Sequence, residues 1–219
     1  MIQNTAIVLA SASPRRRELL TQAGLKFQVI TSDVEEKTEY IKPQDVVLDL
    51  AGHKCRAVAD SIRKEDLKKT FSMEEGKSGL LIVSADTVVA LEDTILGKPV
   101  DEEDALRSLM SLSGRTHEVY TGVACILLRR SPDESGLVES DSFSFFSKTE
   151  VKMYSFDEAE ALDYIATGEP LDKAGSYGIQ GIGERLVESI NGDYNNVVGF
   201  PLSQFIKDLS MRGLLSFQK

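Results

Sequence analysis

Strand-like and helix-like stretches mingle along this chain of 219 residues without a strict β-α-β rhythm. Apolar runs predict strands at residues 6–10, 27–31, 80–85, 119–128, 143–154 and 186–190, and a hairpin made by 87–91 and 94–96 that turns at Glu92-Asp93. Helical spacing of apolar residues predicts helices at 14–24, 43–62, 101–112 and 155–168, and from Pro201 onward. This order favours a mixed α/β sheet flanked by helices over a purely parallel one.

The predicted helix starts rest on local capping chemistry. Ser13 offers an N-cap oxygen and Pro14 suits the first helical position. Ser155 and Glu158 fit a capping box for a helix that ends near Gly168. Polar residues 63–78 predict a loop or frayed helix, and the acidic stretch 131–140, with its Pro and Gly, predicts a mobile surface loop.

Composition narrows the class of protein. With 42% hydrophobic and 27% charged residues, the chain predicts an ordinary globular protein with one large domain, or one domain with two lobes. Its net charge of −10 argues against binding a nucleic-acid polymer but allows a small basic pocket for an anionic metabolite. Two cysteines, the lack of a membrane-span-length apolar stretch and an N-terminus without a secretory pattern lead us to expect a cytoplasmic protein.

The stretch "SASPRRREL" at residues 11–19 predicts an anion site. A helix that begins directly after a strand presents free backbone N–H groups, and the hydroxyls of Ser11 and Ser13 add donors. Arg15 and Arg16 add forked donors that suit phosphate oxygens, whereas a solvated first turn with Arg17 paired to nearby acids is the alternative. Arginine at a helix N-terminus costs about 0.3–1 kcal/mol, which a bound polyanion would reverse.

Carboxylates follow two of the predicted strands. Asp86 in "SADTVV" comes at the expected end of the most apolar strand, where α/β proteins tend to place ligands. It could hold a divalent ion, take a proton from water, or only turn the chain. Glu35 and Glu36 occupy a similar position after the second strand and could complete a metal site or be solvated.

Three lysines are weaker candidates for anion binding. Lys54 lies on the second predicted helix, Lys98 precedes a proline, and Lys173 precedes the glycine-rich stretch 175–183. Those glycines permit close approach of a ligand but match neither the P-loop nor the dinucleotide fingerprint. His53 and His117 are too sparse for a zinc site with Cys55 and Cys125, and no serine-nucleophile elbow is present.

Six blocks in order resemble the Maf family of nucleoside triphosphate pyrophosphatases: "LASASPRRRELL", "SADTVV", "GKP", "LSGRTHEVYTGV", "PLDKAGSYGIQG" and "ING-Y--VVGFPL". The resemblance implies a single domain over residues 1–219, in which an elongated mixed α/β fold, related to the inosine triphosphate pyrophosphatases, forms two lobes around a deep cleft. It implies hydrolysis of a nucleoside triphosphate between the α and β phosphates, with Mg²⁺ or Mn²⁺, and a homodimer. Departures fall at 63–78 and 131–140, which look longer than the usual connections.

The resemblance also implies roles for individual residues. Asp86 would be the catalytic proton acceptor, Glu36 would assist at the metal, and the triphosphate channel would comprise Ser11, Ser13, Arg15, Arg16, Lys54, Lys98 and Lys173. In the branch that acts on dTTP and UTP, Arg15, Thr87 and Gln180 would set substrate choice. Two alternatives stay open: a pyrophosphatase for 7-methyl-GTP or other modified nucleotides, and a nucleotide-binding regulator of division or growth with little catalysis.

Overall fold

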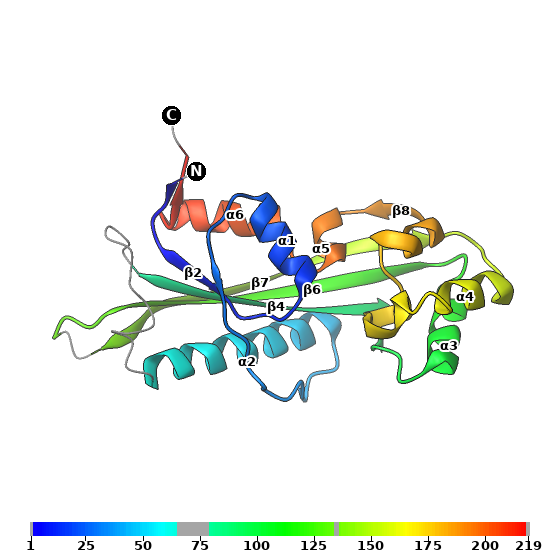
Figure 1. Cartoon of the computed structure of the whole chain (residues 1–219), viewed down its shortest axis with the longest axis horizontal. Helices are drawn as coiled ribbons and strands as arrows, with labels where there is room; N and C mark the ends of the chain where they lie inside the picture. Colours follow the sequence, from blue (N-terminus) through cyan, green and yellow to red (C-terminus); the bar gives the residue numbers. More distant parts are fainter. Residues whose placement is uncertain (1, 65–78, 134–135, 218–219) are drawn as a thin grey trace.

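The computed structural model describes residues 2–64, 79–133 and 136–217 and forms an elongated mixed β-sheet with helices on both faces (Figure 1). The main sheet has the order β3-β2-β4-β6-β7-β8, and β5 pairs with β4. Its strands are β2 (Ala6–Leu9), β3 (Gln28–Val29), β4 (Leu80–Leu91), β5 (Thr94–Leu96), β6 (Thr116–Arg130), β7 (Leu137–Met153) and β8 (Val187–Asn191). Because β2 is parallel to β3 and β4 whereas the other pairs are antiparallel, the predicted mixed sheet is confirmed.

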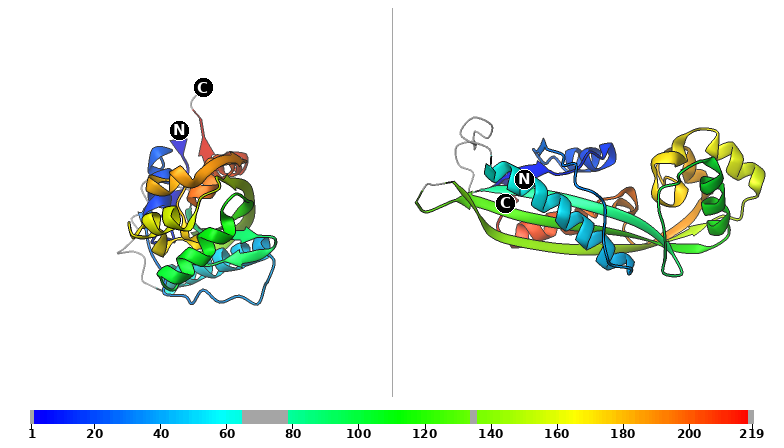
Figure 2. Two further views of the ribbon diagram at one scale, coloured as in Figure 1. Left: turned by 90° about the vertical axis from the view of Figure 1, so that its right-hand side faces the viewer. Right: turned by 90° about the horizontal axis from the view of Figure 1, so that it is seen from below.

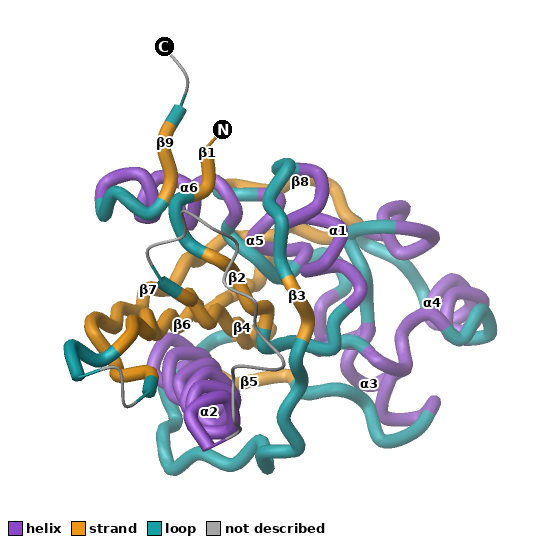
Figure 3. Tube along the Cα trace, turned by 60° about the vertical axis from the view of Figure 1, so that its left-hand side comes forward, coloured by secondary structure: helices purple, strands orange, loops and turns teal. Residues whose placement is uncertain are grey.

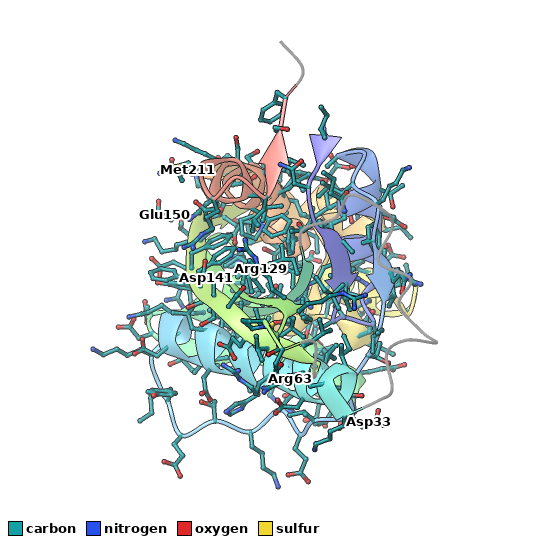
Figure 4. All side chains as sticks on the ribbon, turned by 90° about the vertical axis from the view of Figure 1, so that its left-hand side faces the viewer. Asp33, Arg63, Arg129, Asp141, Glu150 and Met211 are labelled. Carbon is teal, nitrogen blue, oxygen red and sulfur yellow. The ribbon has the colours of Figure 1, made fainter. Side chains whose placement is uncertain are left out.

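The helices form two lobes on this sheet (Figures 1 and 2). In the first lobe, α2 (Pro43–Lys64) covers one face, and α1 (Pro14–Gln22), α5 (Tyr194–Val198) and α6 (Leu202–Met211) cover the other. The second lobe, at the far end, holds α3 (Glu102–Leu112), α4 (Glu158–Ile165) and the 3₁₀ turns η1 (Glu169–Asp172), η2 (Ala174–Ser176) and η3 (Gly181–Leu186). Strands β1 (Ile2–Gln3) and β9 (Leu215–Ser216) pair near the termini. In end view, Met211 on α6 and Arg63 on α2 lie on opposite sides of the sheet (Figure 4).

The central strand β4 is buried on both faces, and its side chains alternate between them. Leu81, Val83 and Ala85 pack in the cluster that includes α1 and α6, whereas Leu80 and Ile82 pack against α2. We call these the α1 face and the α2 face. Successive side chains of a strand point to opposite faces, and this alternation continues along β4 beyond residue 85. Two neighbouring residues there therefore lie on different faces of the sheet.

The edge of β4 is open in the middle. Its first part pairs with β2 through Leu80 to Val83, and its last part pairs with β5 from Val89 onward. Among the described residues, no strand pairs with 84–88 on this side. The predicted hairpin turn at Glu92-Asp93 is confirmed: both residues have positive φ, 51° and 64°, as a tight hairpin of this kind requires.

Three local predictions need correction. The strand predicted to end at residue 85 continues unbroken to Leu91, because β6 pairs with it through Ala90 and β5 pairs with Leu91. The predicted loop 131–140 is wrong in its last part, since β7 begins at Leu137, where it pairs with β6. The capping box at Ser155 is also wrong: the N-cap of α4 is Asp157, whose carboxylate accepts from the Glu160 N–H at 3.0 Å.

The predicted start of α1 is confirmed. Ser13 caps α1, and its side chain accepts from the Arg16 N–H. Residues 63–64 close α2, and the remainder of the polar stretch predicted as loop, 65–78, lies outside the described residues. The helices that the structure describes are too short or too polar to cross a lipid bilayer.

Candidate active site

A cleft of about 670 Å³ lies between the two lobes, at the open edge of β4. One wall is the turn from β2 into α1, the other is formed by η1, η2 and the loop after them, and α2 contributes from below. The chain between β3 and α2 passes across this edge of the sheet (Figure 3). All of the site residues predicted from the sequence line this cleft: Ser11, Ser13, Arg15, Arg16, Glu36, Lys54, Asp86, Thr87, Lys98, Lys173 and Gln180.

Asp86 lies in the middle of β4, opposite Gly122 of β6, and not at a strand end as the sequence predicted. Its side chain is on the α2 face, where Oδ1 accepts a hydrogen bond from Lys54 Nζ at 2.6 Å. The same ammonium group lies 2.6 Å from Glu36 Oε1. The hydrogen bond from Lys54 is the main cause that holds the pKa of Glu36 below its usual value. Lys54 therefore bridges two carboxylates in the cleft.

Close packing of α2 on the sheet places Lys54 at Asp86. A Cβ at Gly122 would lie only 2.5 Å from the backbone C and O atoms of Val47, so the helix reaches the strand because this residue is glycine. One turn further along α2, the Ser84 hydroxyl donates to the Ala51 carbonyl at 2.6 Å. The next helical turn on this side carries Lys54.

Arg16 occupies the α1 face of the same edge. Its guanidinium donates to the Gly199 carbonyl at 2.8 Å, to Ser11 Oγ at 3.2 Å and to Thr87 Oγ1 at 3.1 Å. Burial lowers the pKa of Arg16, an effect that the nearby Asp86 opposes, yet a guanidinium stays charged at neutral pH. Since Asp86 and Thr87 point to opposite faces, the cleft wraps around the open edge of β4.

Thr87 belongs to a polar chain that runs behind Arg16. Its hydroxyl is 2.9 Å from Thr121 Oγ1, and Thr121 donates to the Asn196 carbonyl at 2.9 Å. Because Thr121 has a single proton and gives it to Asn196, Thr87 donates to Thr121 and offers a lone pair to Arg16. The role of Thr87 visible in the structure is thus to hold the guanidinium.

The second wall brings further cations to the cleft. Lys173 Nζ donates to Asp172 Oδ1 at 2.8 Å and to the Glu169 carbonyl at 2.5 Å. Arg15 lies 3.8 Å from Asp172 across the cleft, in an exposed and therefore weak ion pair. Lys98 follows β5 and is exposed at the cleft.

Sequence reasoning missed the residues that hold this wall together. The Glu169 carboxylate accepts from the Tyr164 hydroxyl and from two backbone N–H groups, those of Ile182 and Gly183. Burial raises the pKa of Glu169, but these hydrogen bonds outweigh it, so that the pKa is lowered. Glu169 directly precedes the block "PLDKAGSYGIQG", and its position beside that block was the one available indication.

The carboxylates of Glu36 and Asp86 in the cleft are ligands that suit a hard divalent cation. In the described parts of the chain, no group of three or more His, Cys, Asp or Glu residues is arranged to hold a metal ion by itself. Glu36 and Asp86 nevertheless converge on one point, occupied by the Lys54 ammonium. Mg²⁺ typically takes one or two carboxylates and fills its remaining positions with water and substrate phosphates.

Fold and site together define a class: a mixed α/β protein with a cleft whose arginine and lysine side chains, opposite a carboxylate, suit a polyanion. The model of the family described as Maf-like protein matches residues 6–212. The chain belongs to the Maf family.

Named relatives match most of the chain. A protein of Agathobacter rectalis named dTTP/UTP pyrophosphatase is 43% identical over 212 residues, covering 95% of this chain and 98% of the relative. A protein of Bacillus thuringiensis subsp. konkukian with the same name is 44% identical over 204 residues, covering 93% of each chain. The structure of the Staphylococcus aureus Ham1 protein aligns with a TM-score of 0.45 at 14% identity, covering 84% of this chain and 80% of that one. A likeness of that extent adds nothing to the fold established by the sheet topology.

Proposed function

We propose that the protein hydrolyses dTTP and UTP between the α and β phosphates, releasing a nucleoside monophosphate and pyrophosphate. The observation that carries this proposal is the convergence of cations from both lobes on one cleft that also contains Asp86. Membership of the Maf family and the names of the relatives support the same activity. A triphosphate carries about four negative charges, so its transition state is stabilised by positive charge and positioning more than by a protein nucleophile.

In the mechanism that we infer, the chain's cations hold the triphosphate and Asp86 acts on water. Arg16 keeps a fixed orientation through its bonds to Gly199, Ser11 and Thr87 and presents the rest of its guanidinium to the phosphates. Asp86 orients a water molecule and takes its proton as the water oxygen bonds to the α phosphorus. The bond from the α phosphorus to the bridging oxygen breaks, and pyrophosphate leaves with the electron pair. Lys54, Lys98 and Lys173 offset the charge on the departing group.

Glu36 and Asp86 would hold a divalent cation, Mg²⁺ or Mn²⁺, in this mechanism. When bound, such an ion supplies positive charge that polarises the phosphate oxygens. For this to happen, Lys54 must release one or both carboxylates, since its ammonium group contacts both. The phosphates of the bound nucleotide would then replace these carboxylates as the partner of the Lys54 ammonium group.

Selectivity for uracil and thymine is assigned to Gln180. Its carboxamide has a donor and an acceptor, which match the N3–H and O4 atoms of these bases. The family resemblance adds Arg15 and Thr87 to this selection. Because the Thr87 hydroxyl is bonded to Arg16, we infer that Thr87 influences the substrate through that guanidinium.

Localisation and oligomeric state are further parts of the proposal. We propose a cytoplasmic enzyme, supported by two buried free cysteines and a metabolite substrate. We propose a homodimer on the family resemblance alone.

A substrate panel with Mg²⁺ tests the proposed function. Pyrophosphate release is measured from dTTP, UTP, the other canonical triphosphates and 7-methyl-GTP. We expect the highest kcat/KM for dTTP and UTP. Preference for 7-methyl-GTP would instead place the protein in the sibling branch, and tight nucleotide binding with no turnover on any substrate would favour the regulator.

A further inference from the structure

We propose that Glu169 is a positioning residue for base recognition: by accepting the backbone N–H groups at the start of η3, it leaves the Gln180 carboxamide to the nucleotide. The inference rests on the proposed function and names an additional residue that sets its specificity.

The first observation is the position of Gln180 at the N-cap of η3. Ser, Thr, Asn and Asp side chains at this position commonly accept from the N–H groups of the first turn, because those donors lack helical partners. Within the described residues 136–217, the Gln180 side chain makes no such bond. The donors are satisfied instead by Glu169, whose Oε2 accepts from Ile182 N at 2.9 Å and whose Oε1 accepts from Gly183 N at 3.1 Å.

The second observation is that the chain before Gln180 is fixed by the same network. The Tyr164 side chain is fully buried, and its hydroxyl donates to Glu169 Oε1 at 2.8 Å. That hydroxyl also accepts from Gly178 N at 3.1 Å. The loop is therefore held two residues before Gln180 and again two and three residues after it.

The third observation is that the loop fits this network with no spare room. A Cβ at Gly181, whose φ is +77°, would lie 2.7 Å from Glu169 Oε2. A Cβ at Gly183 would lie 2.4 Å from the Tyr164 hydroxyl. Glycine at these positions lets the backbone reach Glu169 and Tyr164, so the two glycines serve the network that orients Gln180.

Replacing Glu169 by glutamine tests this role. The Glu169→Gln side chain keeps its length but has one acceptor oxygen and an NH₂ group that faces backbone donors. The Gln180 carboxamide is then free to turn toward the unsatisfied N–H groups. We expect the KM for UTP to rise about tenfold, as for loss of one hydrogen bond, while kcat stays within about twofold.

Inorganic tripolyphosphate separates base recognition from phosphate binding, because it carries no base. Its inhibition constant is expected to be unchanged in Glu169→Gln, since Lys173 is held by the Glu169 backbone carbonyl and not by the side chain. The matched control is Glu160→Gln, which removes one charge from an exposed glutamate of α4. This control is expected to leave both constants at the wild-type values.

A double-mutant cycle with Gln180→Ala gives the decisive comparison. If Glu169 acts through Gln180, Glu169→Gln has no further effect on the KM for UTP once Gln180 is alanine. Additive effects, or an equal change in KM, kcat and the tripolyphosphate constant, would overturn the inference. Tyr164→Phe removes the hydroxyl that donates to Glu169 and accepts from the Gly178 N–H. This variant is expected to raise the KM for UTP as well, and it replaces Glu169→Gln in the test if that variant does not fold.

The outcomes also separate this inference from the proposed function. A wild-type protein that does not hydrolyse UTP would refute the function. A wild-type enzyme that selects UTP, together with a Glu169→Gln variant of unchanged KM, would refute only the role of Glu169.

Discussion

The close approach of α2 to β6 can be tested by adding one methyl group. In Gly122→Ala, the new Cβ would lie 2.5 Å from the Val47 backbone, and ordinary contact begins at 3.4 Å. Because the contacted atoms are backbone, relief requires the helix to move by about 1 Å, which is within the range where positioning errors reduce catalysis by about 100-fold. Overpacking of this kind costs about 1–3 kcal/mol of unfolding free energy.

We therefore expect Gly122→Ala to lower the unfolding free energy by about 2 kcal/mol and the Tm by about 4–8 °C. Turnover of UTP, measured well below the Tm, should fall by about 10- to 100-fold because Lys54 moves with α2 away from Asp86. Urea unfolding and steady-state kinetics measure the two effects separately.

Gly52→Ala is the matched control, since it lies on the same helix and its Cβ would meet nothing within 4 Å. Alanine is the better helix former, so this variant is expected to gain about 0.5–1 kcal/mol and to keep full activity. A Gly122→Ala protein as stable and active as the wild type would refute our explanation of how Lys54 is placed.

Three other predictions concern single side chains. Asp86→Asn is expected to lower kcat for UTP by about 100-fold or more in a pyrophosphate-release assay, and near wild-type turnover would exclude Asp86 as the base. Arg16→Lys should raise the KM for UTP about tenfold, because an ammonium group cannot reproduce the three directional hydrogen bonds of the guanidinium. Arg17 is exposed, so Arg17→Lys should leave the KM unchanged. Equal effects of the two substitutions on the KM would contradict the role assigned to Arg16. Burial lowers the pKa of His117 to about 4, below its unfolded value, so the stability it contributes is complete above pH 6.5 and is lost as the pH falls toward 4. Between pH 7 and 4.5, urea unfolding of the wild type should lose about 2–3 kcal/mol more than unfolding of a variant that combines His117→Leu with Tyr177→Phe.

Local chemistry was sufficient to predict several elements. The Ser13-Pro14 start of α1 and the turn at Glu92-Asp93 depend on neighbouring residues alone, and the structure confirms both. The ordered blocks of the sequence also identified a set of residues that the structure brings into one cleft, although their roles remain predictions.

Long-range pairing explains what the sequence could not reveal. A polar residue after an apolar run resembles a strand end, but Asp86 lies within β4 because β6 supplies backbone partners along the full strand. At α4, the sequence predicted Ser155 as the cap, whereas the structure has Asp157, two residues later. Glu169 was missed because its carboxylate on η1 meets the backbone N–H groups of Ile182 and Gly183 on η3 only in the folded chain.

Hydrolysis of UTP in ¹⁸O-labelled water tests the attack on the α phosphorus most directly. Mass spectrometry of the products identifies which fragment carries the label. We predict that pyrophosphate is released unlabelled and that the label is found in UMP. Formation of UDP and orthophosphate, or label in the pyrophosphate, would contradict the placement of water and Asp86 at the α phosphate.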